Sequence, residues 1–86
     1  MITLGSYIRI ILEKKGLKQQ DIVNRINNLG LMEDGAIFTK QKLSNILNGL
    51  APFTVINCKR LEIALDLPEG SLKRFITRRW FYDMSV

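Results

Sequence analysis

The stretch Thr39-Lys-Gln-Lys-Leu-Ser-Asn-Ile-Leu-Asn-Gly49 carries the signals of a short helix with defined ends. The hydroxyl of Thr39 can cap the first turn, and Gly49 can close the helix because glycine adopts the left-handed backbone conformation without steric cost. Between these ends runs an apolar stripe at helical spacing, formed by Leu43, Ile46 and Leu47. The pattern predicts a helix over about residues 40–48 that packs on a core through this stripe.

The opposite face of this predicted helix is polar. Its side chains are those of Lys40, Gln41, Ser44, Asn45 and Asn48. Side-chain amides pair with adenine edges in the major groove of DNA, and lysine reaches guanine acceptors or phosphates. On an isolated helix, the same residues would be ordinary solvated surface. The rest of the chain has to separate these two interpretations.

The remainder of the chain is predicted to be all-α, because apolar residues recur at helical spacing and glycine or proline stands at the breaks. The predicted helices span residues 4–15, about 19–29, about 40–48, about 54–65 and about 69–81. Residues 30–38 are predicted to form a loop. The predicted inward set of the fourth helix is Val55, Ile56, Leu61, Ile63, Ala64 and Leu65, and that of the fifth is Leu72, Phe75, Ile76 and Trp80.

Length and charge restrict the class of protein. The 86 residues, 47% of them hydrophobic, fit a single domain over residues 1–86, with a core over about 4–75 and a tail over 76–86. Thirteen Lys and Arg against eight Asp and Glu give a net charge of +5, which favours a polyanionic partner. No apolar run is long enough for a membrane span, so we expect a cytoplasmic protein without membrane contact.

The residues needed for catalysis are scarce. Cys58 is the single cysteine and the chain has no histidine, so we expect no internal disulfide, metal site or cofactor. The sequence offers no nucleophile with a base, no carboxylate pair and no phosphate-binding loop, so we expect no enzymatic activity. Cys58 is expected to be a small, partly buried apolar side chain.

The order of these features resembles the Cro and lambda-repressor family of helix-turn-helix domains, also called XRE-like, over residues 4–75. The resemblance rests on Gly16-Leu17, Gln19, Ile22-Val23, Thr39-Lys-Gln-Lys-Leu43, Asn48-Gly49, Pro52 and Leu61-Glu-Ile-Ala-Leu-Asp-Leu67. It implies a compact five-helix fold with a helix-turn-helix, in which residues 40–48 form the recognition helix in the major groove.

Carried onto this sequence, the resemblance implies which residues meet DNA. The base-contacting residues would be Lys40, Gln41, Ser44 and Asn45. The phosphate-contacting residues would be Gln19, Thr39, Lys42 and Asn48, with the peptide groups after Gly49 beside them.

The connection between the second and third helices departs from the family pattern, because it is roughly ten residues longer than in many members. We expect Phe38 to replace the apolar residue that usually precedes the recognition helix, with residues 28–38 extruded as a loop or as an extension of the second helix. Glu33 and Asp34 should face away from phosphate or bind another subunit. A surface insertion without a role is the alternative.

A second departure concerns Leu12 and Leu47, which stand where many relatives pair an Arg with a Glu. A hydrophobic contact can replace a buried ion pair at little cost, because two charges no longer need to be desolvated. We therefore predict that Leu47 belongs to the core and does not touch DNA.

The C-terminal stretch mixes basic and aromatic residues. We expect a dimer or partner interface formed by Phe75, Trp80, Phe81 and Tyr82. Base stacking on single strands is the alternative, but helical spacing favours packing.

Together these features predict a sequence-specific regulator of transcription that binds double-stranded DNA. We expect a repressor that binds an inverted-repeat operator as a homodimer and is associated with the nucleoid, with a regulatory protein partner attached at the insertion or the tail. The alternative is an antitoxin or a small protein-interaction adaptor built on the same fold, because function resides in the site and not in the fold.

Overall fold

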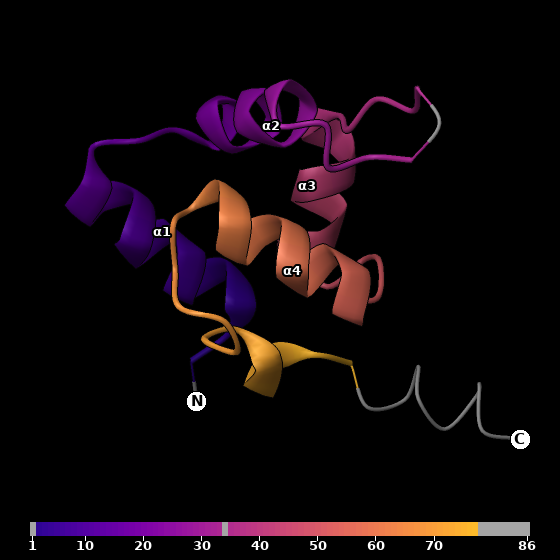
Figure 1. Ribbon diagram of the computed structural model, residues 1–86. Coiled ribbons are helices and arrows are strands. Elements are labelled where there is room, and N and C mark those ends of the chain that lie inside the picture. The colour runs from indigo at the N-terminus through magenta and orange to yellow at the C-terminus, as the bar shows by residue number, and fades with distance from the viewer. Residues whose placement is uncertain (1, 34, 78–86) are drawn as a thin grey trace, which may run out of the picture.

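The computed structural model describes residues 2–33 and 35–77. Within these ranges the chain forms four α-helices and one short 3-10 helix, and no strand (Figure 1). The α-helices are α1 (Leu4–Lys15), α2 (Gln19–Asn28), α3 (Lys40–Leu47) and α4 (Val55–Ala64), and the 3-10 helix is η1 (Lys73–Phe75). The predicted all-α class is confirmed, and the first four predicted helices match α1 to α4 to within a few residues.

Threonine side chains fix where three of the helices begin. The hydroxyl oxygens of Thr3, Thr39 and Thr54 each accept a hydrogen bond from a backbone N–H in the first turn, at 3.1, 3.1 and 3.2 Å. At the start of α2, the Asp21 carboxylate accepts from the backbone N–H of Lys18 at 2.8 Å. Each contact satisfies a donor at a helix start that has no partner within the helix, so these local signals set the boundaries.

The helices enclose one hydrophobic cluster. Its most deeply buried side chains are Phe38, Ile8, Ile22, Ile26, Leu43, Leu61, Leu65 and Leu72. α2 packs against α3 and α4, and α1 packs against α3. Leu12 and Leu47 both belong to this cluster, which confirms that Leu47 is a core residue.

The orientation of α4 differs from the predicted one. Val55, Ile56 and Ile63, predicted to face inward, are 40, 54 and 55% exposed, whereas Glu62 is buried. The Glu62 carboxylate accepts a hydrogen bond from the Leu72 N–H at 2.9 Å. It accepts a second one from the thiol of Cys58, which is also buried, at 3.5 Å. Because a buried carboxylate needs such donors, these contacts turn the Glu62 face of α4 toward the core.

The charge states of this buried pair follow from their surroundings. Burial raises the pKa of the Glu62 carboxyl, but hydrogen bonds from the backbone N–H groups of Leu72 and Gly70 and from the Cys58 thiol together lower it by more, so its pKa lies below the ordinary value. Burial and the neighbouring Glu62 carboxylate raise the pKa of Cys58 to about 11. Cys58 therefore remains a protonated donor to an ionised Glu62 at neutral pH.

The prediction of a fifth helix over residues 69–81 is wrong for residues 69–77, which the structure describes. Only η1 is helical there, and the backbone at Ile76 is extended, with φ −59° and ψ 132°. Gly70 has a left-handed φ of 89°, and the Leu72 N–H donates to Glu62. Thr77 then pairs with Phe53: its N–H donates to the Phe53 carbonyl at 3.1 Å, and its hydroxyl accepts from the Phe53 N–H at 3.0 Å. These tertiary contacts replace the helical hydrogen bonds. Residues 78–81 lie outside the described residues.

The insertion between α2 and α3 is closed at its base by one side chain. The Asn27 amide donates to the Phe38 carbonyl at 2.9 Å and accepts from the Phe38 N–H at 2.8 Å. Arg60 of α4 donates to the carbonyl of Leu31 at 3.0 Å. The connection extends beyond the helices at the upper right of Figure 1, while the Phe38 side chain is buried at the start of α3. Phe38 is therefore a core residue just before α3, and the connection is extruded as a loop, as expected.

Gly5 allows α1 to come close to the end of α3. A Cβ atom at this position would lie 2.6 Å from the carbonyl oxygen of Leu47. Backbone cannot yield as a flexible side chain can, so Gly5→Ala should separate α1 from α3 at a cost of about 1–3 kcal/mol. Thermal unfolding followed by circular dichroism should show a Tm lowered by roughly 4–8 °C for each kcal/mol. Ser6→Ala is the neighbouring control at an exposed position, and equal melting of the two variants would contradict the close approach.

Candidate nucleic-acid interface

α3 separates a buried underside from a polar outer face. Leu43, Ile46 and Leu47 are buried, which fixes how the helix is rotated against the core. On the outer face, Lys40, Gln41, Lys42 and Asn48 are exposed, and Ser44 and Asn45 are half-buried. The structure thus brings every predicted base-contacting residue, Lys40, Gln41, Ser44 and Asn45, onto α3, with predicted phosphate-contacting residues at both of its ends.

Two hydrogen bonds organise the side chains of this outer face. The Gln41 amide donates to the side-chain carbonyl of Asn45 at 2.9 Å, and the Asn48 amide donates to the Ser44 hydroxyl at 3.2 Å. Both pairs are four residues apart, so they lie one turn apart on the same side of the helix. These contacts hold the amides in fixed orientations before any ligand binds, which lowers the entropic cost of binding.

The carboxyl end of α3 uses its own backbone groups. The Asn45 carbonyl accepts from the N–H groups of Leu50 at 2.8 Å and Ala51 at 3.1 Å, and Gly49 has a left-handed φ of 75°. The peptide groups expected to meet a phosphate after Gly49 therefore already have partners. The exposed side chain of Asn48 is the donor that this turn presents to solvent.

The remaining predicted phosphate contacts lie at the amino ends of two helices. Thr39 is exposed, and its oxygen accepts from the Lys42 backbone N–H at 3.1 Å, so its hydroxyl proton can still be donated. Gln19 is half-buried at the first position of α2. Both residues stand where a helix dipole favours an anion.

Three arginines that contribute to the positive charge have contacts within the fold. Arg25 donates to the Ala64 carbonyl at 2.9 Å, Arg60 donates to Leu31, and Arg74 stacks on two aromatic rings. Sequence patterns could not assign most of these roles, because the carbonyls of Ala64 and Leu31 and the ring of Tyr7 are distant along the chain from the arginines that contact them. The exposed cations of α3 are its two lysines.

The predicted partner interface is described only in part. The ring of Phe75 is half-buried, with its centroid 5.4 Å from that of Tyr7 in α1, and the Arg74 guanidinium lies 4.8 Å from the Phe75 ring. Trp80, Phe81 and Tyr82 lie outside the described residues.

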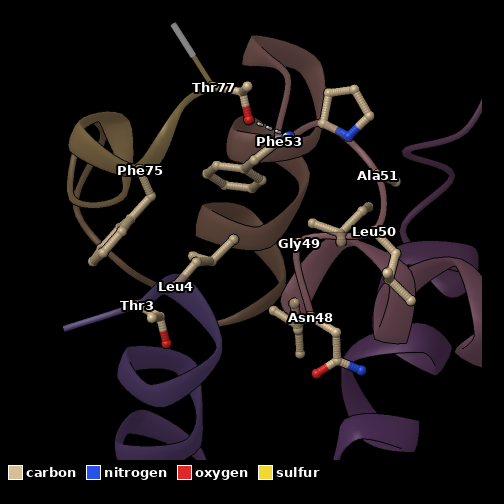
Figure 2. A pocket seen from close by; sticks show the side chains of 12 residues that line it. Thr3, Leu4, Asn48, Gly49, Leu50, Ala51, Phe53, Phe75 and Thr77 are labelled. Carbon is tan, nitrogen blue, oxygen red and sulfur yellow. Dashed lines mark hydrogen bonds between the residues drawn. The ribbon is translucent and has the colours of Figure 1, made fainter. Parts of the chain in front are cut away.

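A groove of about 630 Å³ adjoins the carboxyl end of α3, between the start of α1 and the residues after η1. Figure 2 shows Leu4, Phe53 and Phe75 on one side of it and Leu50 on the other, with the Thr77 to Phe53 hydrogen bond at its rim. Sequence reasoning missed this groove, since segments distant along the chain line it. Its lining combines apolar side chains with the polar side chains of Thr3, Asn48 and Thr77, and carries no cation or acid.

Comparisons with protein-family models, with curated proteins and with solved structures found no match to this chain. Among the described residues, no helix is both long and apolar enough to cross a membrane. Those residues also contain no cluster of three or more His, Cys, Asp or Glu that could hold a metal ion.

Proposed function

We propose that this protein is a sequence-specific regulator of transcription that binds double-stranded DNA, and that it represses by occluding a promoter. The observation that carries the proposal is the amide pair Gln41–Asn45, held at 2.9 Å on the outer face of α3. Lys40 and Lys42 are exposed on the same short helix. The resemblance to Cro and lambda-repressor domains, noted from the sequence, supports the same role for this helix.

The amide pair is suited to read a base edge. Because the Gln41 amide nitrogen donates to Asn45, the Gln41 carbonyl can accept a further hydrogen bond and the Asn45 amide can donate one. Adenine presents a donor at N6 and an acceptor at N7 in the major groove. The two amides together can therefore match adenine, while Lys40 can reach guanine acceptors in the neighbouring base pair.

Phosphates would hold α3 in this position. Thr39 and Lys42 at the start of α3, Asn48 at its end, and Gln19 at the start of α2 are the proposed contacts. Such contacts fix the register of a protein on DNA without reading sequence. Operators of this kind are inverted repeats bound by two copies, so we propose that the protein acts as a homodimer.

Selection of bound duplexes from a random DNA library at physiological salt tests this function. We expect enrichment of an inverted repeat with half-sites about one helical turn apart, near 34 Å. Weak, salt-sensitive binding without an enriched sequence would contradict the proposal. It would favour the adaptor or antitoxin alternative. A protein partner could then contact the apolar side chains of Leu29 and Ile37 on the α2–α3 connection, which are 57 and 72% exposed.

Lys42→Ala should weaken binding to operator and random duplex alike. A cation on a phosphate releases about one counterion, so the slope of log affinity against log salt should flatten by about 0.9. Fluorescence anisotropy titrations at several salt concentrations measure this slope. Lys14→Ala removes an exposed lysine at the end of α1 as a control, and an unchanged slope for Lys42→Ala would remove this residue from the phosphate contacts.

A further inference from the structure

α4 presents an apolar surface to solvent. We define the α4 outer face as Val55, Ile56, Lys59, Ile63 and Leu67. Val55, Lys59 and Ile63 are four residues apart and lie in one line along the helix. Val55, Ile56 and Ile63 are 40, 54 and 55% exposed, Lys59 is exposed, and Leu67 is half-buried. One short helix thus leaves three β-branched apolar side chains exposed, and apolar surface that no other element covers can mark an interaction site.

The orientation of α4 makes this exposure a fixed property of the fold. The helix buries a carboxylate, that of Glu62, while it leaves two isoleucines in water. The Glu62 contacts to Leu72 and Cys58 hold the helix in this rotation, as described above. The patch cannot be hidden by turning α4, because an ionised carboxylate would then lose its donors.

Charges of both signs border the α4 outer face. Two adjoining hollows of about 410 and 310 Å³ lie along it. Lys59, Glu62 and Glu69 line both hollows, and Lys73 lines the larger one. Lys59 and Glu69 thus lie beside the same apolar side chains. In a copy rotated by 180°, the lysine of one copy can meet the glutamate of the other, so the surface can complement itself. DNA is a poor occupant, because Glu69 and Glu62 balance Lys59 and Lys73 around the larger hollow, which leaves it without an excess of positive charge.

We infer that the α4 outer face is the surface through which two copies of this chain associate. The two copies are related by a two-fold axis, so that Ile56 and Ile63 of one α4 pack on the α4 of the other. Lys59 of each copy lies opposite Glu69 of its partner. The regulatory role of this dimer rests on the proposed function, to which the α4 outer face adds the surface that joins the two copies.

Ile63→Glu tests the apolar part of the interface. Sedimentation equilibrium of the full chain without DNA should show a dimer for the unchanged protein and at least about a 30-fold increase in the dimer Kd for the variant. Ile37→Glu is the matched control, since Ile37 is another exposed isoleucine, 72% accessible, on the α2–α3 connection. It should leave the dimer intact, and both variants should keep their helical circular dichroism because neither position is in the core.

A charge exchange tests the pairing across the two-fold axis. Lys59→Glu and Glu69→Lys should each weaken the dimer by bringing like charges together. The double variant Lys59→Glu/Glu69→Lys should restore it, because every copy then carries the exchanged pair. A double variant as weak as the two single variants would overturn the Lys59–Glu69 contact.

Three outcomes would overturn the assignment of the interface to α4. These are an unchanged protein that remains monomeric at all micromolar concentrations, an Ile63→Glu variant that dimerises normally, and a dimer lost with Trp80→Ala but not with Ile63→Glu. The last would transfer the interface to the C-terminal aromatic residues. Duplex selection is a separate measurement, so a dimer that Ile63→Glu disrupts but that enriches no DNA sequence would contradict the proposed function and leave this interface standing.

Discussion

The double variant Gln41→Ala/Asn45→Ala should retain its affinity for random duplex but lose its preference for the selected operator. Each well-made contact between an amide and a base is worth about 1–3 kcal/mol of discrimination. Loss of two such contacts should reduce the ratio of operator to random affinity by roughly 30-fold or more. Competition titrations with the two duplexes at one salt concentration measure this ratio.

α2 offers a control with the same chemistry. Gln20 donates to Asn24 at 3.0 Å, which is an exposed amide pair with the same spacing as the pair on α3. Gln20→Ala/Asn24→Ala should leave discrimination unchanged, because this pair does not lie on α3. If the α3 variant also kept full discrimination, the proposed recognition surface would be wrong.

Leu47→Glu should leave the protein largely unfolded at 25 °C. Leu47 is 9% exposed within the core cluster, and its carbonyl lies at the close approach of α3 to Gly5. The substitution removes an apolar side chain and places an unpaired carboxylate there, at a cost of about 3–5 kcal/mol or more. That cost is comparable to the whole stability of a small domain, which is about 0.05–0.15 kcal/mol per residue. Urea titrations followed by circular dichroism measure the loss.

Leu50→Glu provides the matched comparison for Leu47→Glu. Leu50 is 78% exposed, three residues further along the chain. The same change there should alter the free energy of unfolding by only about 0.5 kcal/mol. Equal stability of the Leu47→Glu and Leu50→Glu variants would show that the end of α3 does not pack as described.

The parts of the fold that follow from local chemistry could be predicted from the sequence. Thr3, Thr39 and Thr54 cap helices through contacts three residues away, so the sequence alone locates those helix starts. The rotation of α4 could not be predicted in this way, because it depends on a hydrogen bond from Leu72, ten residues beyond Glu62. By apolar content alone, Ile56 and Ile63 are better core residues than a glutamate.

In the candidate site, too, the features set by local sequence could be predicted, and those set by distant contacts could not. The apolar stripe of α3 determines which side chains face outward, so the predicted set, including Gln41 and Asn45, is found on one helix. The Asn45 carbonyl accepts hydrogen bonds from the N–H groups of Leu50 and Ala51. These contacts could not be predicted, because they depend on how the chain turns after Gly49. The prediction of the fifth helix failed for a similar reason, since the N–H groups of Leu72 and Thr77 donate to Glu62 and Phe53, far away in the sequence.

The pairing of Asn27 with both backbone groups of Phe38 makes the length of the α2–α3 connection independent of the geometry of α3. Residues can be added near Gly35 at small entropic cost, since doubling a flexible loop costs only about 0.6 kcal/mol. A tag or a foreign peptide inserted near Gly35 should therefore leave α3 in place. Variation in this segment can create new contacts with other molecules while the proposed recognition surface on α3 stays the same.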